Sequence, residues 1–190
     1  NRIWYNRYTL CYGKLENLQI FYEDDGEYKR AINSRSTNEG DFSLDVDNGL
    51  YKIKLYAPSA KEKREFIFRY ELSRGVTVYR DIAQLNRKMV GTEWQSPIKR
   101  INVEGNLPQS VKKDEIYAFG HGTLTGNIEI VNGQLIRYSL DNYYPGEFLE
   151  VNLLFPNDIL TNFNPLVMKN KNGLREILDM ERELAKEANE

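Results

Sequence analysis

The strongest constraint on the fold is an alternation of apolar and polar residues that recurs along most of the chain. Residues 42–46 and residues 51–55 each place three apolar side chains on one face of an extended strand. Asn48 and Gly49 lie between these segments. An Asn-Gly pair favours the type I′ turn of a β-hairpin, because both central residues of that turn need positive φ. The pattern therefore predicts antiparallel sheet with one buried face.

Further segments of β character fall into two groups along the chain. They are residues 18–22, 28–32, 66–72 and 76–79 in the first group, and residues 98–103, 127–131, 135–138 and 148–155 in the second. Asn132 and Gly133 repeat the hairpin signal in the second group. We predict a mainly β protein with two antiparallel β-sandwich-like units, one over residues 1–80 and one over residues 97–160.

The segment between these units follows a different pattern. Ile82, Leu85 and Met89 fit the spacing of one or two helical turns, and Asp81 is a suitable N-cap for them. We predict that residues 81–96 form a short helical linker that packs between the two units.

The C-terminal segment, residues 161–190, is predicted to end in an amphipathic helix from about residue 173. Its stripe at i, i+3, i+4 spacing consists of Leu174, Ile177, Leu178, Glu181, Leu184, Ala185 and Ala188. We expect the second β unit or a neighbouring chain to cover the large apolar members of this stripe, which are Leu174, Ile177, Leu178 and Leu184. We expect solvent to face the acidic residues, which are Glu181, Glu183, Glu187 and Glu190. Since the chain begins with Asn and ends within the predicted helix, we expect it to be a domain of a longer intact protein.

Composition narrows the classes of function. The 26 Lys and Arg nearly balance the 28 Asp and Glu, and the formal net charge of −2 argues against nucleic acid as a partner. With one Cys and one His, the chain lacks an internal disulfide framework and the common multi-Cys or multi-His metal centres. We therefore expect no metal and no cofactor. No apolar run approaches the roughly 18 residues typical of a transmembrane helix.

His121 is the main candidate for chemistry, and it lies in the glycine-rich residues 119–126. A His-Gly pair can belong to the oxyanion loop of an esterase, but the sequence has no G-x-S-x-G nucleophile elbow. Nothing in the sequence brings Cys11 to His121 for a thiolate–imidazolium pair. We assign no catalytic residue. We expect a structural loop histidine whose two flanking glycines, Gly120 and Gly122, take conformations closed to residues with a Cβ.

The order of several short motifs resembles a known family. The motifs are Tyr79-Arg-Asp-Ile-Ala-Gln-Leu85, Val90-Gly91 with Trp94, Pro97-Ile98 with Val103 and Leu107-Pro108, Ala118-Phe-Gly-His-Gly122 with Gly126, and Phe148-Leu-Glu-Val151 with Leu154-Phe-Pro156. Over roughly residues 65–188 they resemble the extracytoplasmic domain of the DUF2207 family, predicted membrane proteins of bacteria and archaea. Arg87 stands where a Trp is usual in that family.

The resemblance implies a location at the cell membrane, on the extracytoplasmic side, with transmembrane segments outside this chain. It implies that the C-terminal helix leads toward such a span, and it supplies no established activity. We therefore expect a non-catalytic binding or assembly module, a monomer or weak oligomer, whose partner is an unidentified protein or envelope component. The candidate binding residues are His121, Gly122, Trp94 and Asp81. Two alternatives remain: a hydrolase of envelope polymers that uses His121, and a carbohydrate-binding module suggested by the 13 Tyr.

Overall fold

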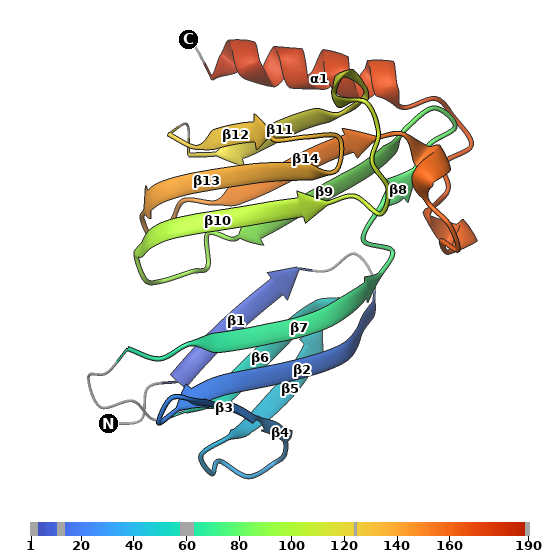
Figure 1. The fold of residues 1–190 in the computed structure, drawn as a ribbon. Coiled ribbons are helices and arrows are strands. Elements are labelled where there is room, and N and C mark those ends of the chain that lie inside the picture. Colours follow the sequence, from blue (N-terminus) through green and yellow to red (C-terminus); the bar gives the residue numbers. More distant parts are fainter. Residues whose placement is uncertain (1–3, 11–13, 58–62, 124, 189–190) are drawn as a thin grey trace. The chain divides into compact units, whose positions relative to one another are not determined.

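The computed structural model describes residues 4–10, 14–57, 63–123 and 125–188. Strands dominate these residues, and the one α-helix among them lies near the C-terminus (Figure 1). The chain divides into two compact units, Asn1–Ser73 (unit 1) and Arg74–Glu190 (unit 2). Each unit contains two sheets built mainly from antiparallel strands. The predicted fold class, mainly β with sandwich-like units and a C-terminal helix, is confirmed.

Unit 1 contains two sheets that share one core. Its strands are β1 (Trp4–Leu10), β2 (Lys14–Asp24), β3 (Glu27–Arg30), β4 (Ile32–Asn33), β5 (Asp41–Asp47), β6 (Leu50–Tyr56) and β7 (Phe66–Ser73). The strand orders are β1-β6-β5-β4 and β3-β2-β7. Ile20 of one sheet packs in the core with Ile53 and Leu55 of the other. Asn48 and Gly49, at φ 48° and 80°, confirm the predicted type I′ turn between β5 and β6.

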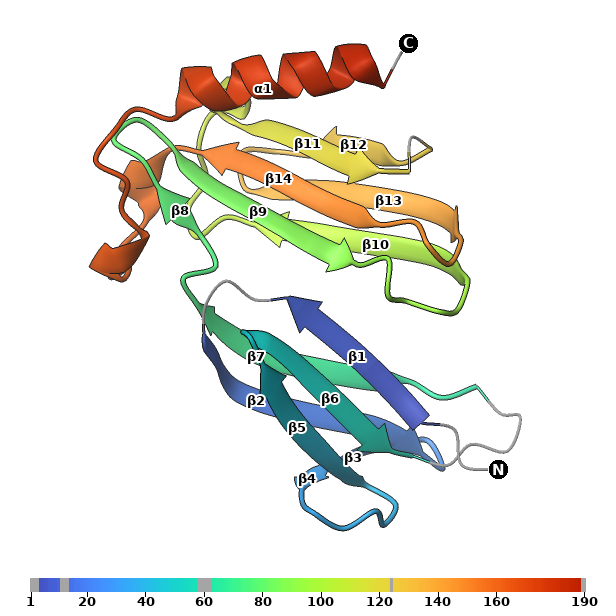
Figure 2. The ribbon, with the colours of Figure 1, turned by 180° about the vertical axis from the view of Figure 1, so that it is seen from behind.

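Unit 2 also contains two sheets, and a helix covers one of them. Its strands are β8 (Thr77–Val78), β9 (Ala83–Val90), β10 (Ile98–Asn106), β11 (Tyr117–Gly122), β12 (Asn127–Ile130), β13 (Leu135–Tyr143) and β14 (Leu149–Phe155). The strand orders are β10-β13-β12 and β11-β14-β9-β8, as seen from both sides in Figures 1 and 2. Val151, Leu153 and Phe155 face the core between the sheets, as the two-residue period predicts. Short 3-10 helices occupy Lys113–Glu115 (η1), Asn157–Ile159 (η2) and Pro165–Val167 (η3).

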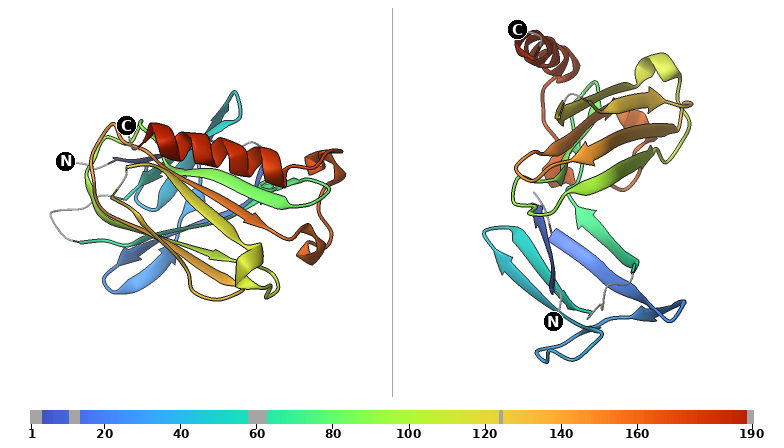
Figure 3. Two further views of the ribbon diagram at one scale, coloured as in Figure 1. Left: turned by 90° about the horizontal axis from the view of Figure 1, so that it is seen from above. Right: turned by 90° about the vertical axis from the view of Figure 1, so that its left-hand side faces the viewer.

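The helix α1 (Leu174–Glu187) lies along the outer face of the sheet that contains β11 and β14 (Figure 3). Ile177 is buried against Ile82 and Leu154, and Leu174 and Leu178 pack around them. The predicted helix is therefore confirmed, and its cover by the second β unit is confirmed for Leu174, Ile177 and Leu178. The predicted cover of Leu184 is wrong, because this residue lies toward the end of the helix and is 41% exposed. Since an isolated helix of this length is marginal in water, this packing supplies most of its stability.

The helical linker predicted over residues 81–96 is wrong. Ala83–Val90 forms β9, an interior strand that pairs with β14 on one side and β8 on the other. Ala83 and Leu85 satisfy the two-residue alternation of a strand, whereas Ile82 and Leu85 satisfy helical spacing. The segment is too short for periodicity to decide between the two, and hydrogen bonding on both edges selects the strand.

Two apolar residues in the predicted strands, which the alternation assigns to the buried faces of their sheets, are exposed. Val46 is 57% exposed near the hairpin end of β5, and Ile128 is 38% exposed in the edge strand β12. The alternation correctly assigns their strands, but the ends and edges of a sheet extend beyond the opposing core.

Candidate functional site

His121 lies within β11 rather than in the loop that the glycine-rich run predicts. Alternation along β11 places His121 on the same face as Tyr117 and Phe119, which pack against α1. On the neighbouring strand β14, Glu150 pairs with His121 in the sheet register. The imidazole therefore lies between the sheet and the helix.

Carboxylates contact both ring nitrogens of His121. Nδ1 lies 3.1 Å from Oε1 of Glu150, and Nε2 lies 2.8 Å from Oε2 of Glu181 on α1. A protonated imidazole donates through both nitrogens, so the imidazolium satisfies both contacts at once. The His121 side chain is 20% exposed, whereas that of Glu181 is 5% exposed.

Beneath α1 the hydrogen bonds continue across the sheet. Asn152, which is 0% exposed, donates Nδ2 to Oε1 of Glu181 at 2.6 Å. Gln84 donates Nε2 to Oδ1 of Asn152 at 2.9 Å, and Tyr79 Oη donates to Oε1 of Gln84 at 3.4 Å. These five residues, His121, Glu181, Asn152, Gln84 and Tyr79, form what we term the buried polar chain.

The buried polar chain compensates for the hydration that the Glu181 carboxylate loses when α1 packs on the sheet. A carboxylate loses its hydration when it is buried, and it needs hydrogen bonds or an opposite charge in return. Glu181 receives both, from the amide of Asn152 and from the imidazole of His121. The arrangement therefore holds the helix on the sheet through polar contacts as well as through its apolar stripe.

The same contacts shift the pKa of His121. Burial disfavours the charged imidazolium and lowers the pKa of His121. Hydrogen bonds to Glu181 and Glu150, and the negative charge of these two residues, favour the imidazolium and raise the pKa. The net effect raises the pKa of His121 above its ordinary value of 6.5. Because the folded state binds the proton more tightly, the stabilisation is complete below the ordinary pKa and is lost as pH rises through the raised value.

We expect α1 to be held more firmly at about pH 6 than at about pH 9, because only the protonated imidazole donates to both carboxylates. The measurement is amide hydrogen exchange of the α1 residues in the full chain, corrected for intrinsic exchange rates. The His121→Gln variant should lose this pH dependence. An equal pH dependence in the wild type and the variant would show that His121 does not cause it.

Asp81 acts as a helix cap, but for a different helix from the one predicted. Its Oδ1 accepts from the backbone N–H of Gly173 at 2.7 Å, and its Oδ2 accepts from that of Leu174 at 3.3 Å. These groups are at the start of α1, where no side chain from the helix's own N-cap position makes the bond. Asp81 and His121 thus hold α1 near two positions, Leu174 and Glu181, about 10 Å apart along the helix axis.

Replacing Asp81 with alanine is expected to lower the free energy of unfolding of unit 2 by about 1 kcal/mol, as the loss of an N-cap does. Asp45→Ala removes an exposed carboxylate from β5 of unit 1 and serves as the control, with an expected change within about 0.5 kcal/mol. Denaturant unfolding of both variants provides the measurement. Equal changes in the free energy of unfolding for Asp81→Ala and Asp45→Ala would contradict the capping role of Asp81.

The four predicted binding residues do not form one site. His121 and Gly122 lie at the end of β11, Asp81 lies at the start of α1, and Trp94 lies half-buried in the loop between β9 and β10. Cys11 lies outside the described residues, so its predicted lack of a role stays a prediction. Among the described residues, no group of three or more His, Cys, Asp or Glu is arranged to hold a metal ion.

Gly122 has the conformation that the sequence predicts. Its φ is 113°, and a Cβ built on it would lie 1.9 Å from the carbonyl oxygen of Phe148. For Gly120, on the other side of His121, a Cβ would have its nearest neighbour at 3.3 Å, and its φ is outside the left-handed region. The prediction is therefore confirmed for Gly122 and wrong for Gly120, whose extended backbone within β11 any residue can adopt.

Sequence reasoning missed the partners of His121. Glu181 was expected to face solvent, but it is buried. The available signal was its place in the apolar stripe of the helix, where an acid needs a buried partner. Asn152 gives a similar signal, because it interrupts the apolar run of residues 151–155.

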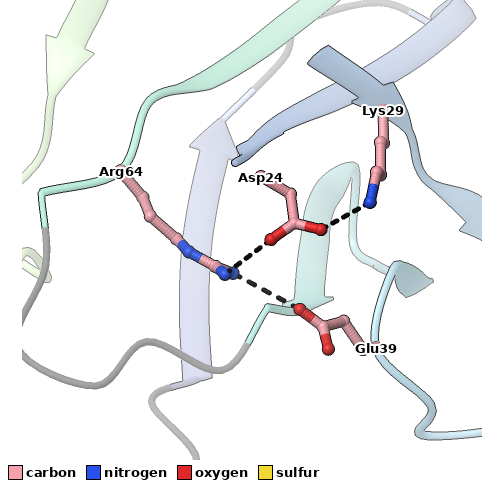
Figure 4. Close-up of polar contacts among 4 residues, drawn as sticks. All are labelled: Asp24, Lys29, Glu39 and Arg64. Carbon is pink, nitrogen blue, oxygen red and sulfur yellow. Dashed lines mark hydrogen bonds and ion pairs between the residues drawn. The ribbon is translucent and has the colours of Figure 1, made fainter. Parts of the chain in front are cut away.

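A second group of charged residues lies in unit 1 (Figure 4). Arg64 contacts Asp24 at 3.1 Å and Glu39 at 3.5 Å, and Lys29 contacts Asp24 at 2.6 Å. Hydrogen bonding to Lys29 lowers the pKa of Asp24. The contacts join the β2–β3 hairpin, the loop before β5 and the segment before β7. Because the Lys29 and Glu39 side chains are about half exposed, we interpret this group as surface ion pairing of modest stabilising effect.

Comparisons with known proteins complete the description of the chain. No helix among the described residues combines the length and the apolar character needed to cross a membrane. Comparison with curated proteins and with solved structures gives no significant match. The family model for the predicted membrane protein (DUF2207) N-terminal domain matches residues 13–155. This match includes most of unit 1, which lies largely outside the motif resemblance over residues 65–188, and it ends before α1. The chain therefore belongs to the DUF2207 family of predicted membrane proteins and carries its N-terminal domain.

Proposed function

We propose that this chain is the extracytoplasmic module of a membrane protein and that it acts by binding or assembly, without catalysis. The family match supports the membrane setting. The proposed partner is another protein or a component of the cell envelope, and the proposed state is a monomer or weak oligomer. In the intact protein, α1 would lead toward a membrane span outside this chain.

The observation that carries the non-catalytic role is the bonding of His121. A general base or acid needs a ring nitrogen within hydrogen-bond reach of a substrate. Both nitrogens of His121 are instead occupied by Glu150 and Glu181, and Glu181 belongs to the helix that covers the site. A substrate would have to displace α1 from the sheet to reach Nε2. The geometry therefore favours a structural role over hydrolysis of envelope polymers.

The catalytic alternative is tested by incubating the full chain with isolated envelope polymers and measuring released fragments. We expect no release above background. Hydrolysis by the wild type that disappears in a folded His121→Gln variant, but persists in Asp81→Ala, would contradict the proposal. Asp81→Ala is the matched control because it weakens the attachment of α1 without removing the imidazole.

Sidedness is tested in cells that express the full-length protein. Ile32 is 66% exposed, so Ile32→Cys on a Cys11→Ser background gives a labelling site in unit 1. We expect a membrane-impermeant maleimide to label this cysteine in intact cells, and the Cys11→Ser background alone controls for other thiols. Labelling only after the cells are opened would place the domain on the cytoplasmic side.

A further inference from the structure

An exposed apolar cluster projects from unit 2 between η2 and α1. Phe163 is 37% exposed, Leu166 is 71% exposed and Met168 is 57% exposed. Together these three residues form what we term the apolar tip. They account for three of the ten exposed large hydrophobic residues of the described chain, within six consecutive positions. A cluster of this kind indicates an interaction surface, whereas single exposed apolar residues are common.

The apolar tip is held in place by its backbone. Asn164 accepts from the N–H of Leu166 at 2.9 Å and caps η3. Met168 forms a β-bridge with Val78, and the N–H of Lys169 donates to the carbonyl of Val78 at 2.7 Å. Figure 1 shows this segment as the orange turn beside β8. The fold therefore presents the apolar side chains to solvent on a structured turn.

Three basic residues flank the apolar tip, and acids lie beside two of them, with Asp81 next to Arg80 and Glu176 paired with Lys171. Residues 159–173 contain no Asp or Glu, and Lys169 and Lys171 directly follow the tip. Arg80 lies at its base, where Nε and Nη2 donate to Oδ1 of Asn170 at 3.0 and 2.7 Å. Lys171 also pairs with Glu176 at 2.6 Å, which reduces its contribution. The tip segment itself carries no acid, and Lys169 and Arg80 supply positive charge beside it, in a chain whose net charge is −2.

We propose that the apolar tip inserts into the interfacial region of an anionic phospholipid bilayer. Apolar side chains beside Lys and Arg suit this region, because the former enter the acyl boundary while the latter contact acidic headgroups. The inference rests on the membrane setting in the proposed function, and it is independent of whether the module is catalytic. It gives unit 2 a second contact with the membrane, separate from any span that follows α1.

The test measures partitioning of the full chain onto vesicles of phosphatidylcholine with about one third phosphatidylglycerol. We expect binding that weakens at high salt. Leu166→Ser and Met168→Ser should each weaken partitioning about tenfold, because each removes a large apolar side chain from the acyl boundary. Lys169→Gln should weaken it about fivefold. Ile32→Ser is the matched control, since Ile32 is 66% exposed in unit 1 and should not affect partitioning.

Three results would overturn the proposal. One is a wild-type chain that does not bind the vesicles, which would leave a protein partner as the cover of the tip. Another is Ile32→Ser weakening binding as much as Leu166→Ser does. The third is a large drop in the melting temperature of Leu166→Ser, which would show that the residue stabilises the fold. The hydrolysis and labelling experiments have separate readouts, so failure of the proposed function is distinguishable from failure of this inference.

Discussion

Replacing Glu181 with alanine is expected to lower the free energy of unfolding of unit 2 by about 2–3 kcal/mol. The change leaves the buried amide of Asn152 without its acceptor and removes one of the two carboxylates that face His121. The loss should fall below the largest values for buried ion pairs, because His121 keeps Glu150 and is partly exposed. Denaturant unfolding and hydrogen exchange of the α1 amides measure the effect.

The control for Glu181→Ala is Glu183→Ala on the same helix. Glu183 pairs with Lys186 on the exposed face, and the side chains of both residues are 67% exposed. Its removal should change the free energy of unfolding by no more than about 0.5 kcal/mol. Similar losses in the two variants would mean that the buried position of Glu181 contributes nothing beyond helix propensity.

Replacing Gly122 with alanine is expected to destabilise unit 2 by about 2–4 kcal/mol. The new methyl group would meet the carbonyl oxygen of Phe148 at 1.9 Å, and a φ of 113° is unfavourable for any residue with a Cβ. The backbone where β11 ends beside β14 would therefore have to move. Thermal and denaturant unfolding of the variant provide the measurement.

Gly146→Ala separates the two causes. Gly146 has a φ of 93°, but a Cβ there would meet nothing within 4 Å. This control should show only the strain of positive φ, about 1–2 kcal/mol. A loss in Gly122→Ala that is no larger than the loss in Gly146→Ala would show that the contact with Phe148 relaxes at little cost.

The sequence predicts those parts of the fold that local rules determine. The Asn48-Gly49 hairpin and the core face of residues 151–155 follow from turn chemistry and from the two-residue period. The sequence could not separate strand from helix over β9, because its apolar residues satisfy both periods. Pairing with β14 and β8 decides that case, and such pairing is a non-local interaction.

The candidate site depends on non-local contacts to a greater extent than the hairpins and strands of the fold do. His121 and Asp81 stand out in the sequence, but Glu181 lies 60 residues from His121 within α1, and Gly173, the N-cap of α1, lies 92 residues from Asp81. The register of the helix on the sheet determines which acid reaches His121, and an apolar stripe alone permits a slip by one turn. Such a slip would move Glu181 by about 5.4 Å and break its contacts with His121 and Asn152. The buried polar chain therefore fixes the position of α1 as well as holding it.

The central claim is that His121 holds α1 on the sheet through Glu181. A double-mutant cycle with His121→Ala and Glu181→Gln tests it most directly, with the stability of α1 read from amide hydrogen exchange in the full chain. We predict a coupling free energy of about 1–3 kcal/mol between the two residues. Additive effects of the two substitutions, within about 0.5 kcal/mol, would contradict the claim.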